Sequence, residues 1–118
     1  MTKETWEKNS FFMQMSNIGA EIGRTIIWKG KDVSKSKAAF ERGLELLDLT
    51  IADKKNRTSK LKELCRLREM LVGYFCFDVR HGYSDKDWND YFYPFNYAAA
   101  MEMEKRFSLK SQIPNLKS

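Results

Sequence analysis

Apolar side chains recur every three or four residues through most of the chain, and this pattern is clearest from Lys37 to Asp53. An α-helix turns once in about 3.6 residues, so positions at this spacing lie on one stripe of its surface. The stripe here consists of Phe40, Leu44, Leu47 and Ile51, widened by Ala39, Gly43 and Leu46. A face this broad needs neighbours to cover it, so we expect the segment to form the middle of a helical assembly.

The same spacing predicts a helix before this one, over residues 5–28. Its apolar stripe comprises Phe12, Met15, Ile18, Ile22 and Ile26. Gly30 then stops the helix, because glycine readily adopts the left-handed conformation that ends helices. Ser34 or Ser36 is expected to cap the helix that follows.

Two further helices are predicted in the second half of the chain. The third covers residues 59–77 behind a cap at Thr58 or Ser59, and its stripe is Leu61, Leu64, Leu67, Leu71 and Tyr74. The fourth begins at Ser84–Asp87, where a hydroxyl and a carboxylate three residues later form a capping box. Its inward side chains are Trp88, Tyr91, Phe92, Phe95 and Ala99.

Glycine and proline modify this pattern at three places. Gly19 and Gly23 lie four residues apart in the first helix. Glycine in a helix costs about 1 kcal/mol relative to alanine, so we expect a compensating close approach of another helix. Pro94 lacks a backbone donor and should kink or split the last helix. Residues 108–118 are polar and contain Pro114, which favours a flexible C-terminal tail.

Together these elements predict an all-α protein, an antiparallel up-down-up-down four-helix bundle with a kinked last helix. Residues 1–107 form the single bundle domain and residues 108–118 the polar tail. In this topology the N-terminus, the loop at residues 54–60 and the C-terminus meet at one end. The connections at residues 29–37 and 78–84 meet at the other end.

Charged residues on the predicted seam between the second and third helices are arranged in opposite pairs. Folding the chain back between residues 56 and 59 brings Glu45 level with about residues 66–71, which include Arg66, and Arg42 level with about residues 69–73, which include Glu69. Glu21 on the first helix reaches Arg42 from its other side. Such groups could form a polar active site, because they perturb each other's ionisation. We favour an ion ladder that fixes helix register, made of Glu21, Arg42, Glu45, Arg66 and Glu69.

Composition narrows the class of partner. The chain has 118 residues, of which 42% are hydrophobic, enough for one domain with a real core. Lys and Arg number 21 against 16 Asp and Glu, a net charge of +5 that favours phosphate-rich or acidic partners. The end that contains the 54–60 loop carries +6, against +1 at the other end. The candidate nucleic-acid-binding residues in and beside this loop are Lys54, Lys55, Arg57, Lys60 and Lys62.

No group of residues predicts catalysis, a metal site or a cofactor. His81 is the only histidine and has no serine or cysteine at triad spacing. Cys65 and Cys76 have no further ligand at zinc spacing, so we expect buried free thiols. The Glu-x-x-His pattern of di-iron bundles and glycine-rich phosphate loops are absent. No secretory leader and no apolar run near the roughly 18 to 20 residues of a membrane span occur, which predicts a cytoplasmic protein.

Three segments, residues 15–24, 39–53 and 61–69, resemble a family of small uncharacterised bacterial helical proteins. The resemblance covers the chain from Trp6 to Ala100 and implies no particular activity. In architecture and charge the chain is also similar to the small basic four-helix proteins that accompany reverse transcriptases in diversity-generating retroelements. That similarity implies an oligomer that binds nucleic acid and the polymerase.

A second architectural similarity is to the HEPN ribonucleases of toxin systems, whose motif is arginine, four to six residues, then histidine. Here Arg80 directly precedes His81, and residues 75–77 contain no arginine, so the motif is not met. The leading hypothesis is a non-enzymatic accessory protein that binds nucleic acid or a polymerase-type protein partner, as a homo-oligomer. The alternatives are a HEPN-like toxin or antitoxin component, and a protein-interaction subunit without nucleic-acid binding.

Overall fold

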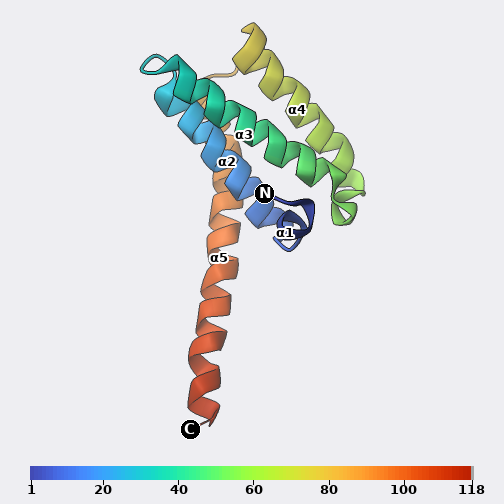
Figure 1. Cartoon of the computed structure of the whole chain (residues 1–118), viewed down its shortest axis with the longest axis vertical. Coiled ribbons are helices and arrows are strands. Elements are labelled where there is room, and N and C mark those ends of the chain that lie inside the picture. The colour runs from blue at the N-terminus through green and yellow to red at the C-terminus, as the bar shows by residue number, and fades with distance from the viewer. Residues whose placement is uncertain (118) are drawn as a thin grey trace.

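The computed structural model describes residues 1–117, with side chains as far as residue 109, and this part of the chain is all-α (Figure 1). It contains five α-helices, one short 3-10 helix (η1) and no strand within those residues. The elements are α1 (Lys3–Glu7), α2 (Phe11–Trp28), α3 (Val33–Ala52), η1 (Lys54–Asn56), α4 (Ser59–Phe77) and α5 (Asp85–Lys117). The prediction of an all-α protein is therefore confirmed, whereas the four-helix bundle arrangement is not.

Several helix ends lie where local chemistry predicts them. Gly30 has φ +92°, as expected for a residue that stops α2. Thr58 caps α4, its hydroxyl accepting from the Lys60 amide. At the start of α5 the Ser84 amide donates to Asp87 Oδ2 at 2.8 Å, and the Asp87 amide donates back to Ser84 Oγ at 3.3 Å. This reciprocal pair is the predicted capping box.

Two helix starts differ from prediction. The helix predicted over residues 5–28 is broken into α1 and α2, because the Ser10 hydroxyl accepts from the Met13 amide and caps α2. The next helix begins at Val33 instead of after a serine cap. Asp32 caps it by accepting from the Lys35 amide at 3.1 Å, and a carboxylate is as good a cap as a hydroxyl.

Helix α2 is central, since α3 packs on one side of it and α5 on another (Figure 1). A methyl group added at Gly19 would lie 2.8–3.0 Å from three atoms of Phe92 on α5. One added at Gly43 on α3 would lie 3.4 Å from Glu21 Cβ and from Ile22 Cδ1 on α2. Helices α5 and α3 therefore each approach α2 closely at a glycine, which is Gly19 of α2 in the first contact and Gly43 of α3 in the second. Gly23 differs, with open space around its Cα.

The core draws on four helices. Its buried apolar members are Met15, Ile18 and Ile22 from α2, Phe40 and Leu47 from α3, Leu64, Leu67, Leu71 and Tyr74 from α4, and Trp88 and Phe92 from α5. Aromatic contacts join the last three helices, with ring centroids 5.2 Å apart for Phe40 and Phe75 and 5.9 Å apart for Tyr74 and Trp88. The predicted stripes thus do face one another, although Phe12 is exposed.

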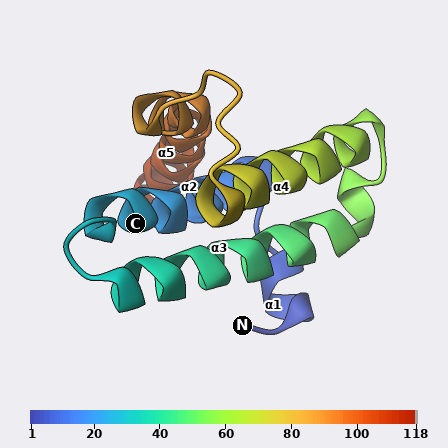
Figure 2. The same ribbon diagram turned by 90° about the horizontal axis from the view of Figure 1, so that it is seen from above.

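Helix α5 does not align with the others as a simple bundle would require. Figure 2 shows α5 nearly end-on while α3 and α4 lie lengthwise, so it crosses them. It is nevertheless tied to both ends of α2, by the Lys29–Asp85 ion pair at 2.8 Å and by the Ser10 hydroxyl, which donates to Glu102 at 2.6 Å. Beyond Glu102 the helix extends past the rest of the molecule as an arm (Figure 1).

The predicted end of the last helix also needs revision. Helix α5 continues to Lys117, through residues predicted to form a tail. Polar composition and Pro114 indicated a tail from residue 108, but the helix continues there from residues 101–106, which are methionine, glutamate, lysine and arginine, all strong helix formers. Pro94 does not split the helix. It lies on the exposed side, where water can satisfy the carbonyl that loses its donor.

The two cysteines are free but exposed, contrary to the prediction of buried thiols. Both lie on α4, and their positions are rotated well away from the stripe of Leu64, Leu67 and Leu71 that faces the core. The prediction of burial was based on apolar neighbours in the sequence, and these do not determine which side of the helix a cysteine occupies. Among the described helices, none has the length and apolar character to cross a membrane.

The two glycines of α2 offer a matched test of the packing. We expect Gly19→Ala to destabilise the protein by about 1–3 kcal/mol, because Cβ would overlap the rigid base of the Phe92 side chain. Gly23→Ala should stabilise it by up to about 1 kcal/mol, through helix propensity alone. Urea unfolding of both variants measures the difference. Equal effects would contradict the described α2–α5 contact.

Candidate nucleic-acid interface

The predicted basic residues lie at the corner between α3 and α4, which comprises η1 and the first turn of α4 (Figure 1). The corner is built around polar side chains with almost no exposure. Gln14, Thr50 and Asn56 are completely buried and Asp53 is 4% exposed. Buried polar groups must find partners inside the protein, so their hydrogen bonds determine the path of the backbone.

Gln14 on α2 is at the centre of this network. Its amide nitrogen donates to Asp53 Oδ2 at 2.8 Å and to the carbonyl of Trp6 at 3.3 Å. Its amide oxygen accepts from Asn56 at 3.1 Å, and Asn56 also donates to the carbonyl of Thr50 at 2.9 Å. One glutamine thereby links α1, α2, the end of α3 and η1.

Two further bonds close the network. The indole of Trp6 donates to the hydroxyl of Thr50 at 3.0 Å. Lys55 forms an ion pair with Asp53 and also donates to the carbonyl of Glu7 at 3.2 Å. Burial raises the pKa of Asp53, but hydrogen bonds from Lys55 and Gln14 outweigh burial and lower it below its usual 3.8. Asp53 is therefore a charged part of the framework, and its charge is neutralised locally.

The five candidate residues fall into two groups. Lys55 holds Asp53, and Lys60 lies over the ring of Phe11 with its Nζ 4.4 Å from the ring centroid. Lys54, Arg57 and Lys62 are exposed and make no side-chain ion pair within the described residues. Lys54, Arg57 and Lys62 therefore direct their charge to solvent. The sequence alone did not indicate that Lys55 has a structural role.

The start of α4 adds to the positive potential of the corner. Residues 54–62 contain five basic side chains and no carboxylate. Helix α4 begins within this segment at Ser59, and its first amide groups carry the partial positive charge of a helix N-terminus. The arrangement can attract a polyanion.

The predicted ion ladder is only partly assembled. Arg42 Nε donates to Glu21 Oε2 at 3.1 Å, as predicted, and Arg24 occupies the other oxygen at 3.0 Å. Between α3 and α4 the recorded pair is Arg68 with Asp48, at 2.7 Å. Within residues 1–109, no ion pair joins Glu45 to Arg66 or Arg42 to Glu69. These side chains are exposed. The position of the loop at which α4 folds back on α3 was predicted well, but the rotation of the two helices about their own axes was not.

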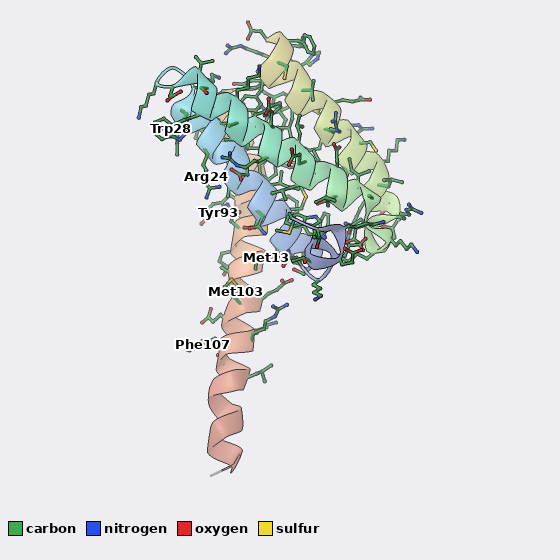
Figure 3. The ribbon with its side chains drawn as sticks, in the orientation of Figure 1. Met13, Arg24, Trp28, Tyr93, Met103 and Phe107 are labelled. Atoms are coloured by element: carbon green, nitrogen blue, oxygen red, sulfur yellow. The ribbon has the colours of Figure 1, made fainter. Side chains whose placement is uncertain are left out.

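A second basic surface was not predicted. Arg24, Trp28, Lys35 and Arg42 line a small cavity of about 160 Å³ between α2 and α3. Lys35 Nζ lies 4.3 Å from the centroid of the Trp28 ring, and Figure 3 shows Arg24 and Trp28 on the same side of α2. The spacing of Arg24 and Trp28, four residues apart on one helix, was the available signal. Glu21 neutralises part of this charge.

A cleft beside α4 contains a further group with a shifted pKa, Tyr74. Burial, and a hydrogen bond to Asp85 at 2.6 Å, raise the pKa of Tyr74 to about 12. Burial raises the pKa of Asp85, but hydrogen bonds from Lys29 and Tyr74 outweigh it and lower the value. This cluster joins the start of α5 to α2 and α4. Nearby, Arg80 pairs with Asp78 at 2.7 Å and His81 is exposed.

Among the described residues, no group of three or more histidine, cysteine, aspartate or glutamate side chains could hold a metal ion. Comparison with known proteins adds no family: no family model, no curated protein and no solved structure matches the chain. The functional inference therefore depends on the geometry of the corner.

Protonation of Asp53 at low pH should destabilise the folded protein. The pKa of Asp53 is lower in the folded state than in the unfolded chain. Its contribution to the free energy of unfolding is therefore present at neutral pH, and it is lost as the pH falls below about 4 towards the pKa of the folded state. We expect Asp53→Asn to cost about 1–3 kcal/mol at neutral pH and to flatten the acid dependence of unfolding. Asp48→Asn, which breaks an exposed pair, is the control. An unchanged acid profile in Asp53→Asn would contradict the network.

The seam between α3 and α4 can be tested by double-mutant cycles. Asp48 and Arg68 should show a coupling of about 0.2–1 kcal/mol, because both are partly exposed. Glu45 and Arg66 should show coupling near zero. Chemical denaturation of each single and double alanine variant measures both values. Stronger coupling in the second pair would restore the predicted ladder.

Proposed function

We propose that the protein is a non-enzymatic helical accessory module that binds nucleic acid through the corner between α3 and α4. The observation that carries the proposal is the cluster in residues 54–62, where five cations occur without a carboxylate on a backbone held by buried hydrogen bonds. Of the two carboxylates that flank the segment, Asp53 is already neutralised by Lys55, and Glu63 follows Lys62 on the exposed surface of α4. The corner therefore presents a local positive field that the modest net charge of +5 does not reveal.

Rigidity is as important as charge in this proposal. A flexible basic loop loses conformational entropy when it binds, whereas a corner fixed by Gln14 and Asn56 has lost that entropy on folding. Lysine side chains contact phosphates as point charges, and no exposed aromatic ring lies within the segment to stack on bases. The expected mode is sequence-independent contact with the sugar–phosphate backbone.

The proposal places the protein in the cytoplasm, beside a nucleic-acid enzyme such as a polymerase, which would contact another surface. The alternative is an interaction subunit that binds only protein, and its predicted behaviour differs clearly. Phosphate contacts release condensed counterions, so true nucleic-acid binding weakens steeply as salt rises. Binding to a protein surface has no such steep dependence.

The test compares two variants of equal charge. The corner variant replaces Lys54, Arg57, Lys60 and Lys62 with glutamine and keeps Lys55, because Lys55 holds Asp53. Fluorescence anisotropy with labelled single-stranded and duplex DNA and RNA, over a range of salt concentrations, measures affinity. We expect the corner variant to bind at least about tenfold more weakly, and its salt slope to fall by about 3, close to 0.7–0.9 for each lost contact.

The control variant replaces Arg24, Lys31, Lys35 and Lys37 with glutamine, which removes the same charge from the surface near Trp28. It should retain most of the affinity. Equal losses in both variants would mean that a diffuse field, and not the corner, attracts the polyanion. Failure of the unmodified protein to bind any of the four probes at low salt would overturn the proposal in favour of a protein partner.

A further inference from the structure

Helix α5 carries a second apolar stripe beside the face that packs into the core. The core face consists of Trp88, Phe92 and Ala99. The second stripe consists of Tyr93, Tyr97, Met103 and Phe107, which are 66%, 62%, 58% and 73% exposed. Figure 3 shows Tyr93, Met103 and Phe107 along the same side of the helix. A surface helix normally has a single apolar stripe, so the second face indicates a second interface.

The occupant of this face can be inferred from its internal symmetry. Ala100 lies at the centre of the stripe and is exposed. Tyr97 and Met103 lie three residues on either side of Ala100, and Tyr93 and Phe107 lie seven residues on either side. In an antiparallel pair with its two-fold axis at Ala100, Tyr97 of one copy would face Met103 of the other. A self-complementary stripe is what an isologous dimer requires.

Charge along α5 favours the same arrangement. Residues 85–92 carry a net charge of −2, whereas residues 103–109, the last whose side chains are described, carry +1. Antiparallel pairing brings these unlike ends together and also opposes the two helix dipoles, whereas parallel pairing would bring like ends together. Glu104 lies within the stripe and would face Asn96 of the second copy. Asn96 already accepts from Ser16 at 2.9 Å through its oxygen, so its amide nitrogen remains to donate.

The available area is adequate for a specific contact. Large side chains bury up to about 200 Å² each, so four of them at these exposures supply roughly 1,000 Å² over two copies. That area meets the lower limit for a biological interface before flanking residues are counted.

We propose that the protein forms a homodimer through antiparallel pairing of two α5 helices across the stripe centred on Ala100. This dimer does not depend on the nucleic-acid proposal. It places the two α3–α4 corners on opposite sides of a two-fold axis.

The first experiment measures oligomeric state by sedimentation velocity on the full chain. We expect a dimer in the micromolar range, and the double variant Tyr97→Glu/Met103→Glu should raise the dimer Kd at least about 30-fold. Leu109→Glu is the matched control, because Leu109 is 60% exposed on the same helix but faces away from the stripe. It should leave the dimer Kd within about threefold. Circular dichroism checks that each variant remains helical.

The second experiment tests the direction of pairing by disulfide formation in a background with Cys65 and Cys76 changed to serine. Ala100→Cys should crosslink with itself. Tyr97→Cys and Met103→Cys should crosslink readily only when the two variants are mixed. A monomer at 100 µM, or self-crosslinking of Tyr97→Cys without the mixed product, would overturn the proposed dimer.

Discussion

The close contact between Gly19 of α2 and Phe92 of α5 is the constraint on which the fold depends. Helix α5 packs on α2 along only part of its length, and Phe92 enters the core at the position where α2 has no side chain. Gly43 allows a comparable approach of α3 on another side of α2. Because the two contacts share the region of α2 from Gly19 to Ile22, a change in one would alter the packing available to the other. The polar pairs at the ends of α2 then orient α5, but they do not bring it close.

The buried network at the α3–α4 corner has a different role. Apolar packing holds the middle of the molecule, whereas the corner is held by directional bonds from Gln14, Asp53 and Asn56. Such bonds specify geometry more strictly than apolar contacts, because a displaced donor leaves a buried group unsatisfied. The Asn56 Oδ1 atom already has no partner within the described structure. At the corner, buried hydrogen bonds fix the backbone, and basic side chains project from that fixed backbone to solvent. The fold thereby positions the proposed binding surface.

Much of the fold follows from local sequence, and the limits of that inference are physical. The caps at Thr58 and Ser84, and the stop at Gly30, depend on neighbouring residues and were predicted correctly. The break before α2 was missed because apolar spacing continues across Ser10. The pairing of Asp48 with Arg68 was missed because the rotation of a helix about its axis is set by tertiary packing. For the same reason the cluster of lysines could be found from sequence, but the role of Lys55 could not.

The two exposed cysteines of α4 have a consequence for redox behaviour. Cys65 and Cys76 are eleven residues apart on one helix, which separates their Cα atoms by roughly 16 Å. A disulfide needs Cα atoms within about 7 Å, so these thiols cannot bond to each other while α4 is intact. Oxidation must therefore join different molecules or add a small thiol such as glutathione. Handling the protein without reductant would produce covalent aggregates through a surface separate from the α5 stripe, and thiol-specific dyes would report on α4 alone.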